Sequence, residues 1–154
     1  MTWTELMRVI VPGEPVPKAR PRFARTHRGV RTYTCKRTVA FERSVALYVG
    51  TGLPRPPRAS LWAPAGVPVR VDIVAVMKRP QRLQRKKDPP GRVEHALRCD
   101  LDNIIKAILD GIGICPGLWE DDGQVQCIRA EKVYASKDEN PHTLIAIYLP
   151  SGYR

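Results

Sequence analysis

Two acidic clusters stand out in a strongly basic chain. The first is Asp100-Leu101-Asp102, and the second, further along, is Glu120-Asp121-Asp122. Mg²⁺ takes oxygen ligands and keeps several waters, so two or three carboxylates together with substrate phosphates make a sufficient site. An ion held in this way can ionise a bound water and stabilise an in-line phosphoryl transition state. The pattern therefore favours metal-assisted chemistry on a phosphate ester.

A purely structural interpretation of the same residues is also open. Asp100 lies at the expected start of a helix, where the unpaired N–H groups and the helix dipole favour a carboxylate. The second cluster lies at an expected turn, where acidic residues are often only solvated. This interpretation explains a lone aspartate well, but it explains a pair separated by one apolar residue less well.

The helix that would position the first cluster has the best helical pattern in the chain. Apolar residues recur at i, i+3, i+4, i+7, i+8 and i+11, which predicts an amphipathic helix over 101–112. The apolar stripe is Leu101, Ile104, Ile105, Ile108, Leu109 and Ile112. On the neighbouring polar stripe, Asp102, Lys106 and Asp110 follow one another at four-residue intervals, so Asp102 and Lys106 are expected to adjoin.

The other elements are expected to form a sheet with a second helix. Strict alternation predicts a strand over 67–77, and apolar runs bounded by turn signals predict strands over 6–11, 125–135 and 143–149. Residues 38–50 fit an amphipathic helix, and the Pro-rich, basic stretch 78–92 is expected to be an exposed, mobile loop. The order β-α-β-α-β-β predicts a small α+β domain with helices packed on a mixed sheet.

The charge balance indicates a polyanionic partner. The chain of 154 residues has a formal net charge of +11, and such an excess favours nucleic acid, because each neutralised phosphate releases a counterion. Residues 18–37 contain no acidic residue and no periodicity, so they are expected to form a basic loop or extended arm. Its candidate DNA contacts are Lys18, Arg20, Arg22, Arg25 and Lys36.

Zinc and membrane functions are disfavoured by the sequence. The four cysteines form no C-x-x-C pair, and the three histidines lie in expected loops, where they are predicted to be surface residues. No stretch has the pattern of a secretory leader or the length of a membrane span. We therefore expect a cytoplasmic protein with reduced thiols.

Three stretches together resemble the RusA family of Holliday junction resolvases: DLDNIIKAILDGI from residue 100, EDDGQV from residue 120 and VPGEPVPKARPRF from residue 11. The resemblance implies a single RusA-like endonuclease domain over residues 1–154, with a small mixed sheet and packed helices. It implies a crossover junction endodeoxyribonuclease that uses Mg²⁺, or Mn²⁺, and no small-molecule cofactor. Such enzymes act as homodimers that cut four-way DNA junctions by paired symmetric nicks in recombination and repair, near the nucleoid, and many are encoded by phages or prophages.

The resemblance also implies roles for individual residues. Asp100, Asp102 and Asp122 correspond to the catalytic, metal-binding aspartates, and Lys106 to the required lysine. Asp121 is the alternative ligand in the second cluster, but Asp122 aligns with the motif through Gln124 and Val125. Relatives commonly carry a basic residue directly before the first aspartate, where this chain has Cys99.

Two alternatives to junction resolution stay open at this point. One is a non-catalytic, basic nucleic-acid-binding protein, which would bind with a steep salt dependence and would not cut. The other is a nuclease of the same fold that acts on forks or flaps, since branch recognition depends on shape more than on a few local residues.

Overall fold

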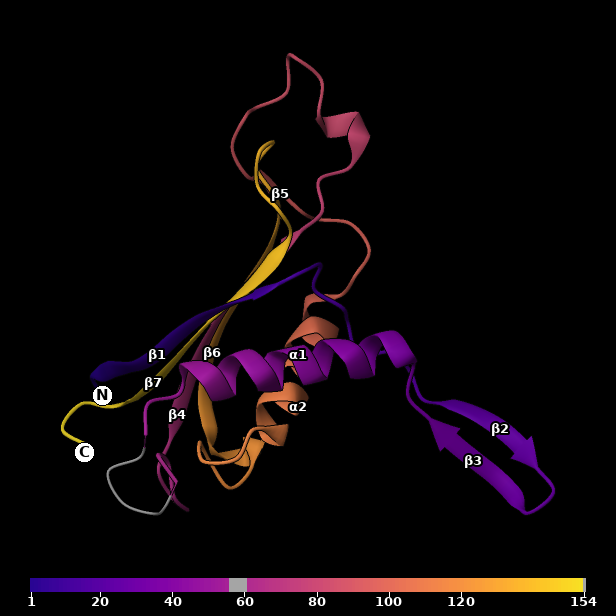
Figure 1. Ribbon diagram of the computed structural model, residues 1–154. Coiled ribbons are helices and arrows are strands. Elements are labelled where there is room, and N and C mark those ends of the chain that lie inside the picture. Colours follow the sequence, from indigo (N-terminus) through magenta and orange to yellow (C-terminus); the bar gives the residue numbers. More distant parts are fainter. Residues whose placement is uncertain (56–60, 154) are drawn as a thin grey trace.

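A five-stranded mixed sheet forms the centre of the protein. The computed structural model describes residues 1–55 and 61–153. The sheet has the order β1-β7-β4-β6-β5, in which only β4 and β6 run parallel to each other. Its strands are β1 (Trp3–Pro12), β4 (Val69–Met77), β5 (Val93–Glu94), β6 (Val125–Tyr134) and β7 (His142–Pro150). The α+β class with a mixed sheet is therefore confirmed (Figure 1).

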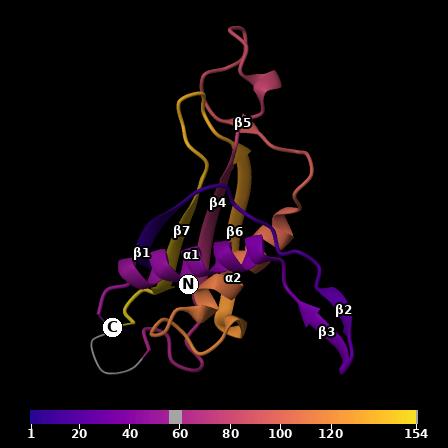
Figure 2. The same ribbon diagram turned by 45° about the vertical axis from the view of Figure 1, so that its right-hand side comes forward.

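Two helices cover one face of this sheet, α1 (Lys36–Gly52) and α2 (Leu101–Ile114). Figures 1 and 2 show both helices on the same side of the strands. The alternating pattern of β4 turns Val71 and Ile73 into the core, where they join fully buried Ile104, Ile108 and Ile112 of α2. α2 belongs to the crossover that connects the parallel strands β4 and β6. The core therefore fixes α2 rigidly against the sheet.

The stretch that the sequence predicted to be a basic loop or extended arm contains a hairpin. Strands β2 (Arg22–Thr26) and β3 (Gly29–Tyr33) pair antiparallel and project away from the body (Figures 1 and 2). Neither strand has a buried residue. The two strands were not predicted because the period of two that marks a strand arises from burial of one face, and this hairpin buries neither. An isolated two-stranded hairpin is only marginally stable in water.

Residues 78–92, which we call the apex loop, are built around one buried arginine. Arg79 is only 4% exposed. Its guanidinium donates hydrogen bonds to the carbonyls of Leu83 at 2.7 Å, Gly91 at 2.7 Å and Pro89 at 2.6 Å. A short 3₁₀ helix, η1 (Gln81–Leu83), lies in the loop. These bonds give the loop a defined internal structure, which the sequence-based expectation of a mobile loop did not include.

The base of the apex loop is tied to the β6–β7 turn by an ion pair. Arg92 Nη2 lies 2.5 Å from Glu139 Oε1, and Glu139 also accepts a hydrogen bond from the Ser136 N–H. The hydrogen bond from Arg92 is the main reason that the pKa of Glu139 falls to about 2. Glu139 therefore stays ionised to low pH in the folded protein.

This ion pair predicts a specific acid sensitivity. Because the pKa of Glu139 is lower in the folded than in the unfolded chain, its stabilisation is present above about pH 4.5 and is lost as pH falls towards 2. After allowance for solvent screening, we expect wild type to lose about 2 kcal/mol more unfolding free energy over this range than Glu139→Gln. Urea titrations at a series of pH values measure this difference. Asp138→Asn is the control, and equal pH slopes for wild type and Glu139→Gln would contradict the prediction.

Candidate active site

Asp100 and Asp102 both lie at the start of α2. Asp100 is the N-cap residue and Asp102 is in the first turn, and both are exposed. The Asp100 side chain makes no capping hydrogen bond. Within residues 1–55 and 61–153, neither carboxylate forms an ion pair. Asp100 therefore has the position of a helix cap without making the contact of one, and its oxygens can accept outside ligands at the positive end of the helix dipole.

The segment that leads into Asp100 is fastened to the end of β6. β5 pairs with β6 through Val93 opposite Tyr134. The rings of His95 and Tyr134 stack with centroids 4.1 Å apart, and His95 is 9% exposed. Burial lowers the pKa of His95. The prediction that the histidines are surface residues is therefore wrong for His95, because the packing of this segment on Tyr134 is a tertiary contact.

Cys99 connects this segment to Asp100 and is half-buried against the core. Burial raises the pKa of its thiol. Its carbonyl accepts a hydrogen bond of 2.6 Å from Lys132 Nζ on β6. The residue directly before Asp100 is therefore neutral and packed against the core.

The second acidic cluster forms its own capped turn. The short 3₁₀ helix η2 (Asp122–Gln124) is capped by Asp121, whose side chain accepts a 2.6 Å hydrogen bond from the Gly123 N–H. Gln124 Nε2 donates to the carbonyls of Ala63 and Pro64, so the glutamine of the motif holds the turn in place. The exposed Asp122 makes no ion pair with any residue that the structure describes.

The structure does not bring Asp122 to the Asp100–Asp102 pair within one chain. η2 directly precedes Val125 at the start of β6, whereas the carbonyl of Cys99 is bound by Lys132, seven residues further along that strand. At about 3.3 Å per residue, the two points on β6 are about 23 Å apart. In the described ranges, no group of three or more His, Cys, Asp or Glu side chains is arranged to hold a metal ion. The two acidic clusters therefore lie towards opposite ends of β6.

Lys106 is exposed one turn after Asp102. No ion pair joins it to Asp102 or to any other carboxylate of the described residues. The surface ion pair that would explain this lysine structurally is thus absent from the described structure. Its ammonium group is free to approach a phosphate.

Lys18, a predicted DNA contact, lies against the two helices. Its ammonium is 2.5 Å from Glu42 Oε1 and 2.6 Å from Asp110 Oδ2, and its backbone N–H donates to the carbonyl of Asn103. Partial burial alone would lower the pKa of Lys18, but the bonds to Asp110 and Glu42 raise it overall. Lys18 thus fastens the start of the arm to α1 and α2, and its ammonium already has two partners.

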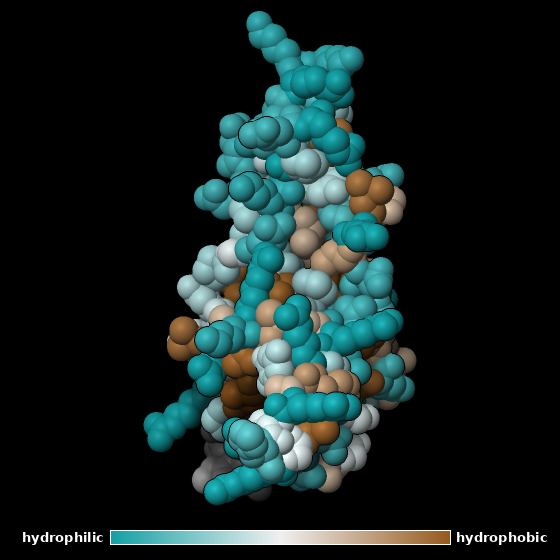
Figure 3. Space-filling model, turned by 90° about the vertical axis from the view of Figure 1, so that its right-hand side faces the viewer, coloured by the Kyte–Doolittle hydropathy of each residue, from teal (hydrophilic) through white to brown (hydrophobic). Residues whose placement is uncertain are grey.

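The other predicted DNA contacts differ from Lys18 in their surroundings. All four are exposed, on the hairpin or beside it, and none of them forms an ion pair with a described residue. They are Arg20, Arg22, Arg25 and Lys36. Seen from the hairpin side, hydrophilic side chains cover most of the molecule up to the apex loop (Figure 3).

The start of α2 lies between two basic projections. Figures 1 and 2 show it on the side of the molecule from which the hairpin projects, below the apex loop. The apex loop exposes Arg82, Lys86 and Lys87. Sequence reasoning did not select these three residues as DNA contacts, although the run of basic residues in this stretch could have identified them. The carboxylates are therefore placed where a polyanion attracted by both projections would pass.

The donor set at the start of α2 fits a divalent cation of the Mg²⁺ type. Mg²⁺ commonly binds one or two carboxylates and completes its shell with waters and substrate phosphates. Asp100 and Asp102 supply two exposed carboxylates without protein partners in the described structure. This arrangement suits a reaction at a phosphate group, because the phosphate oxygens would complete the coordination of the cation.

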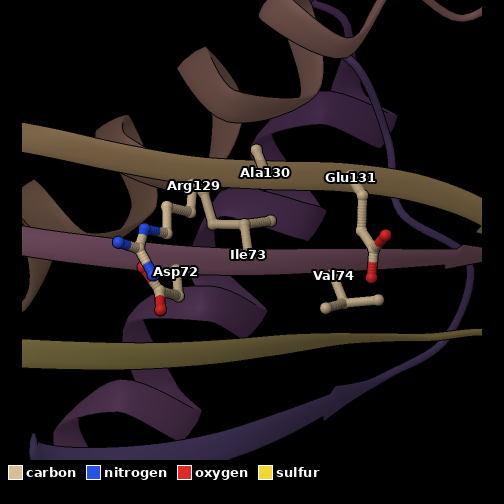
Figure 4. Close-up of a pocket in the computed structure, with 6 residues that line it drawn as sticks. All are labelled: Asp72, Ile73, Val74, Arg129, Ala130 and Glu131. Carbon is tan, nitrogen blue, oxygen red and sulfur yellow. The ribbon is translucent and has the colours of Figure 1, made fainter.

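A shallow pocket on the opposite, helix-free face of the sheet has a different composition. It has a volume of about 280 Å³ and is formed by neighbouring residues of β4 and β6 (Figure 4). Its lining residues are Asp72, Ile73, Val74, Arg129, Ala130 and Glu131. None of the predicted catalytic residues is among them, so the candidate site is the exposed start of α2 and not this pocket.

Comparison with known proteins identifies the family. The family model described as "Endodeoxyribonuclease RusA" matches residues 12–148, which include the hairpin, both acidic clusters and all of α2. A search of curated proteins finds no match. None of the helices in residues 1–55 and 61–153 has the length and apolar character needed to cross a membrane. Since the match covers most of the chain, this protein belongs to the RusA family of endodeoxyribonucleases.

Proposed function

We propose that this protein is a Mg²⁺-dependent endonuclease that resolves four-way DNA junctions by paired symmetric nicks, in recombination and repair. The observation that carries the proposal is a pair of exposed carboxylates at the start of α2, which have no ion-pair partner among the described residues and lie between the basic hairpin and the apex loop. Family membership supports the cleavage of DNA. The charge of +11 supports binding to a polyanion.

In this proposal each part of the chain has a separate task. Asp100 and Asp102 hold the divalent cation, with Mn²⁺ as a substitute, at the scissile phosphate. When bound, the cation lowers the pKa of a water and neutralises charge on the leaving oxygen. Lys106 donates to the phosphate oxygens as negative charge develops on them.

The hairpin is proposed to position the DNA. Arg22 and Arg25 contact phosphates, which fixes the register of the duplex without reading its sequence. Phe23 is 72% exposed on this hairpin, and Tyr33 is 49% exposed. An exposed aromatic side chain is suited to stacking on a base at the open centre of a junction, where bases lack a stacking neighbour.

Paired nicks call for two sites, and we propose that a homodimer supplies them. A two-fold axis relates two identical sites to two symmetry-related DNA strands. The dimer also offers a way for Asp122 to take part, because in one chain this residue lies towards the other end of β6 from Asp100. In this proposal Asp122 of a second copy completes the carboxylate set.

Two competing functions make different predictions. A nuclease specific for forks or flaps would share the site but prefer other branched DNA. A non-catalytic binding protein would leave Asp100 and Asp102 without a chemical role. Neither carboxylate has an ion-pair partner among the residues that the structure describes, which favours a catalytic function over the non-catalytic one.

The test is cleavage of labelled DNA with Mg²⁺, with Mn²⁺ and with a chelator. The substrates are a four-way junction, a fork and a linear duplex of matched sequence. We expect symmetric nicks in the junction with either metal, no nicks in the duplex, and complete loss of cutting with the chelator. Preferential cutting of the fork would reassign the substrate, and tight junction binding without cutting under any condition would refute the nuclease proposal.

A further inference from the structure

The backbone directly before Asp100 has an unusual conformation. Cys99 has φ of 90°, and it is the only non-glycine residue with positive φ in the described part of the chain. This region of conformational space favours glycine, and a residue with a side chain pays on the order of 1–3 kcal/mol to occupy it. Such a conformation persists only where surrounding contacts impose it.

Lys132 supplies contacts that can hold Cys99 in this conformation. This half-buried residue lies on β6, paired in register with Ala75 on the central strand β4. Its Nζ donates hydrogen bonds to the carbonyl oxygens of Leu97 at 2.7 Å and Cys99 at 2.6 Å. Hydrogen bonds from an ammonium group are roughly twice as strong as those between neutral groups. A rigid strand therefore holds two carbonyls on the segment that enters α2.

The segment that Lys132 holds leads directly into Asp100, the N-cap residue of α2. Asp100 enters the helix with φ of −66° and ψ of 132°, and its backbone carbonyl accepts the first helical hydrogen bond from the Ile104 N–H. An N-cap aspartate ordinarily turns its side chain back onto the helix N–H groups. Here it does not. The Asp100 carboxylate is therefore not engaged by the N–H groups of its own helix.

We propose that Lys132 is a positioning residue of the active site, which holds the carbonyls of Leu97 and Cys99 so that the Asp100 carboxylate stays in metal-binding geometry. The inference rests on the proposed function in one respect, the role of Asp100 as a metal ligand. Lys132 itself touches neither metal nor DNA in this proposal, because two backbone carbonyls already engage its ammonium group.

The chain contains a closely matched control for this lysine. Lys137 Nζ also donates to two backbone carbonyls, those of Arg85 and Asp88, at 2.8 Å each. These bonds hold the apex loop and not the segment before Asp100. Lys132→Met and Lys137→Met therefore remove the same kind of contact from two different segments.

The decisive measurement is the affinity of the full-length protein for Mn²⁺, determined by calorimetry without DNA. We expect Lys132→Met to weaken this affinity by roughly 10-fold or more, as is typical for residues that orient metal ligands, and Lys137→Met to leave it unchanged. Lys132→Arg, which keeps two donors, should retain most of the affinity. Binding of a four-way junction in the presence of chelator should be the same for wild type, Lys132→Met and Lys132→Arg.

A second pair of variants tests the backbone without changing Lys132, in case Lys132→Met does not fold. At the positive φ of Cys99, a β-branched residue is strongly disfavoured, whereas glycine is accommodated freely. Cys99→Val should therefore weaken Mn²⁺ binding, and Cys99→Gly should not.

The outcomes separate the two proposals. Equal Mn²⁺ affinity for wild type and Lys132→Met, or equal losses in Lys132→Met and Lys137→Met, would overturn the positioning role. A wild-type protein that binds no Mn²⁺ would overturn it as well. A selective loss of Mn²⁺ affinity in Lys132→Met, combined with no cleavage of any DNA by wild type, would support the positioning role and refute the nuclease proposal.

Discussion

Asp100→Asn should abolish metal-dependent cleavage of a four-way junction and leave junction binding intact. The substitution keeps the shape of the side chain but removes the charge that would hold the cation. We expect a loss of at least about 10²–10³-fold in the single-turnover rate, the range seen when one catalytic electrostatic contact is removed. Binding in the presence of chelator should change little, because the basic hairpin and the apex loop are untouched. Asp102→Asn should behave in the same way.

The control for these variants is Asp138→Asn, an exposed aspartate in the β6–β7 turn. Its cleavage rate should equal that of wild type. Asp100→Asn protein that still cuts at the normal rate, with its fold verified by circular dichroism, would show that Asp100 is not a metal ligand.

Asp122→Asn gives a separate result, because Asp122 lies towards the other end of β6 from Asp100 within one chain. If a second copy supplies Asp122, each single variant is inactive, but a mixture of Asp100→Asn and Asp122→Asn proteins recovers activity at one of the two sites of the mixed dimer. We expect this mixture to nick junctions on one strand only. If Asp122→Asn alone has full activity, Asp122 is not part of the active site.

Gly111→Leu should destabilise the protein strongly, although leucine is a far better helix former than glycine. A Cβ at position 111 would lie 2.8 Å from the backbone oxygen of Glu42 and 2.8 Å from Val45 Cβ, so α1 and α2 would have to separate. We expect a loss of about 3 kcal/mol of unfolding free energy, at the upper end of typical overpacking costs. For a chain of this size, that corresponds to a fall in Tm of roughly 10 °C.

Gly113 in the same helix is the matched control. A Cβ there meets no atom of residues 1–55 or 61–153 within 4 Å. Gly113→Leu should therefore show only the gain in helix propensity, about 0.8 kcal/mol of stabilisation. Thermal melts and urea titrations of both variants measure the two effects, and stabilisation by both would mean that the helix contact at Gly111 is looser than the structure indicates.

The elements that the sequence predicted correctly are those that bury a face. The apolar stripe of α2 predicted a helix, and Ile104, Ile108 and Ile112 are fully buried on it. The alternation in β4 likewise arises from its contact with the core. Hydrophobic periodicity arises from burial of one face, so it predicted both of these elements. It did not predict the hairpin, in which no residue is buried.

The catalytic roles of the predicted site residues stay a prediction, but the structure shows where each of them lies. The D-x-D pair is local, so its position at the start of α2 followed directly from the helical pattern. Asp122 is different, because it lies before the start of β6, whereas the segment that enters α2 is bound near the end of that strand. The contributions of Lys132 and His95 depend on contacts between distant parts of the chain, and no local pattern marks them.

The hairpin without a buried residue has a consequence for how the family can diversify. Substitutions at its exposed positions should change the folding free energy by no more than about 0.5 kcal/mol. DNA preference can then change by mutation of β2 and β3 while the core and the carboxylates of α2 stay as they are. In this protein the region with the greatest freedom to change sequence is also the one proposed to meet the substrate first, so new specificities can arise there without a loss of stability.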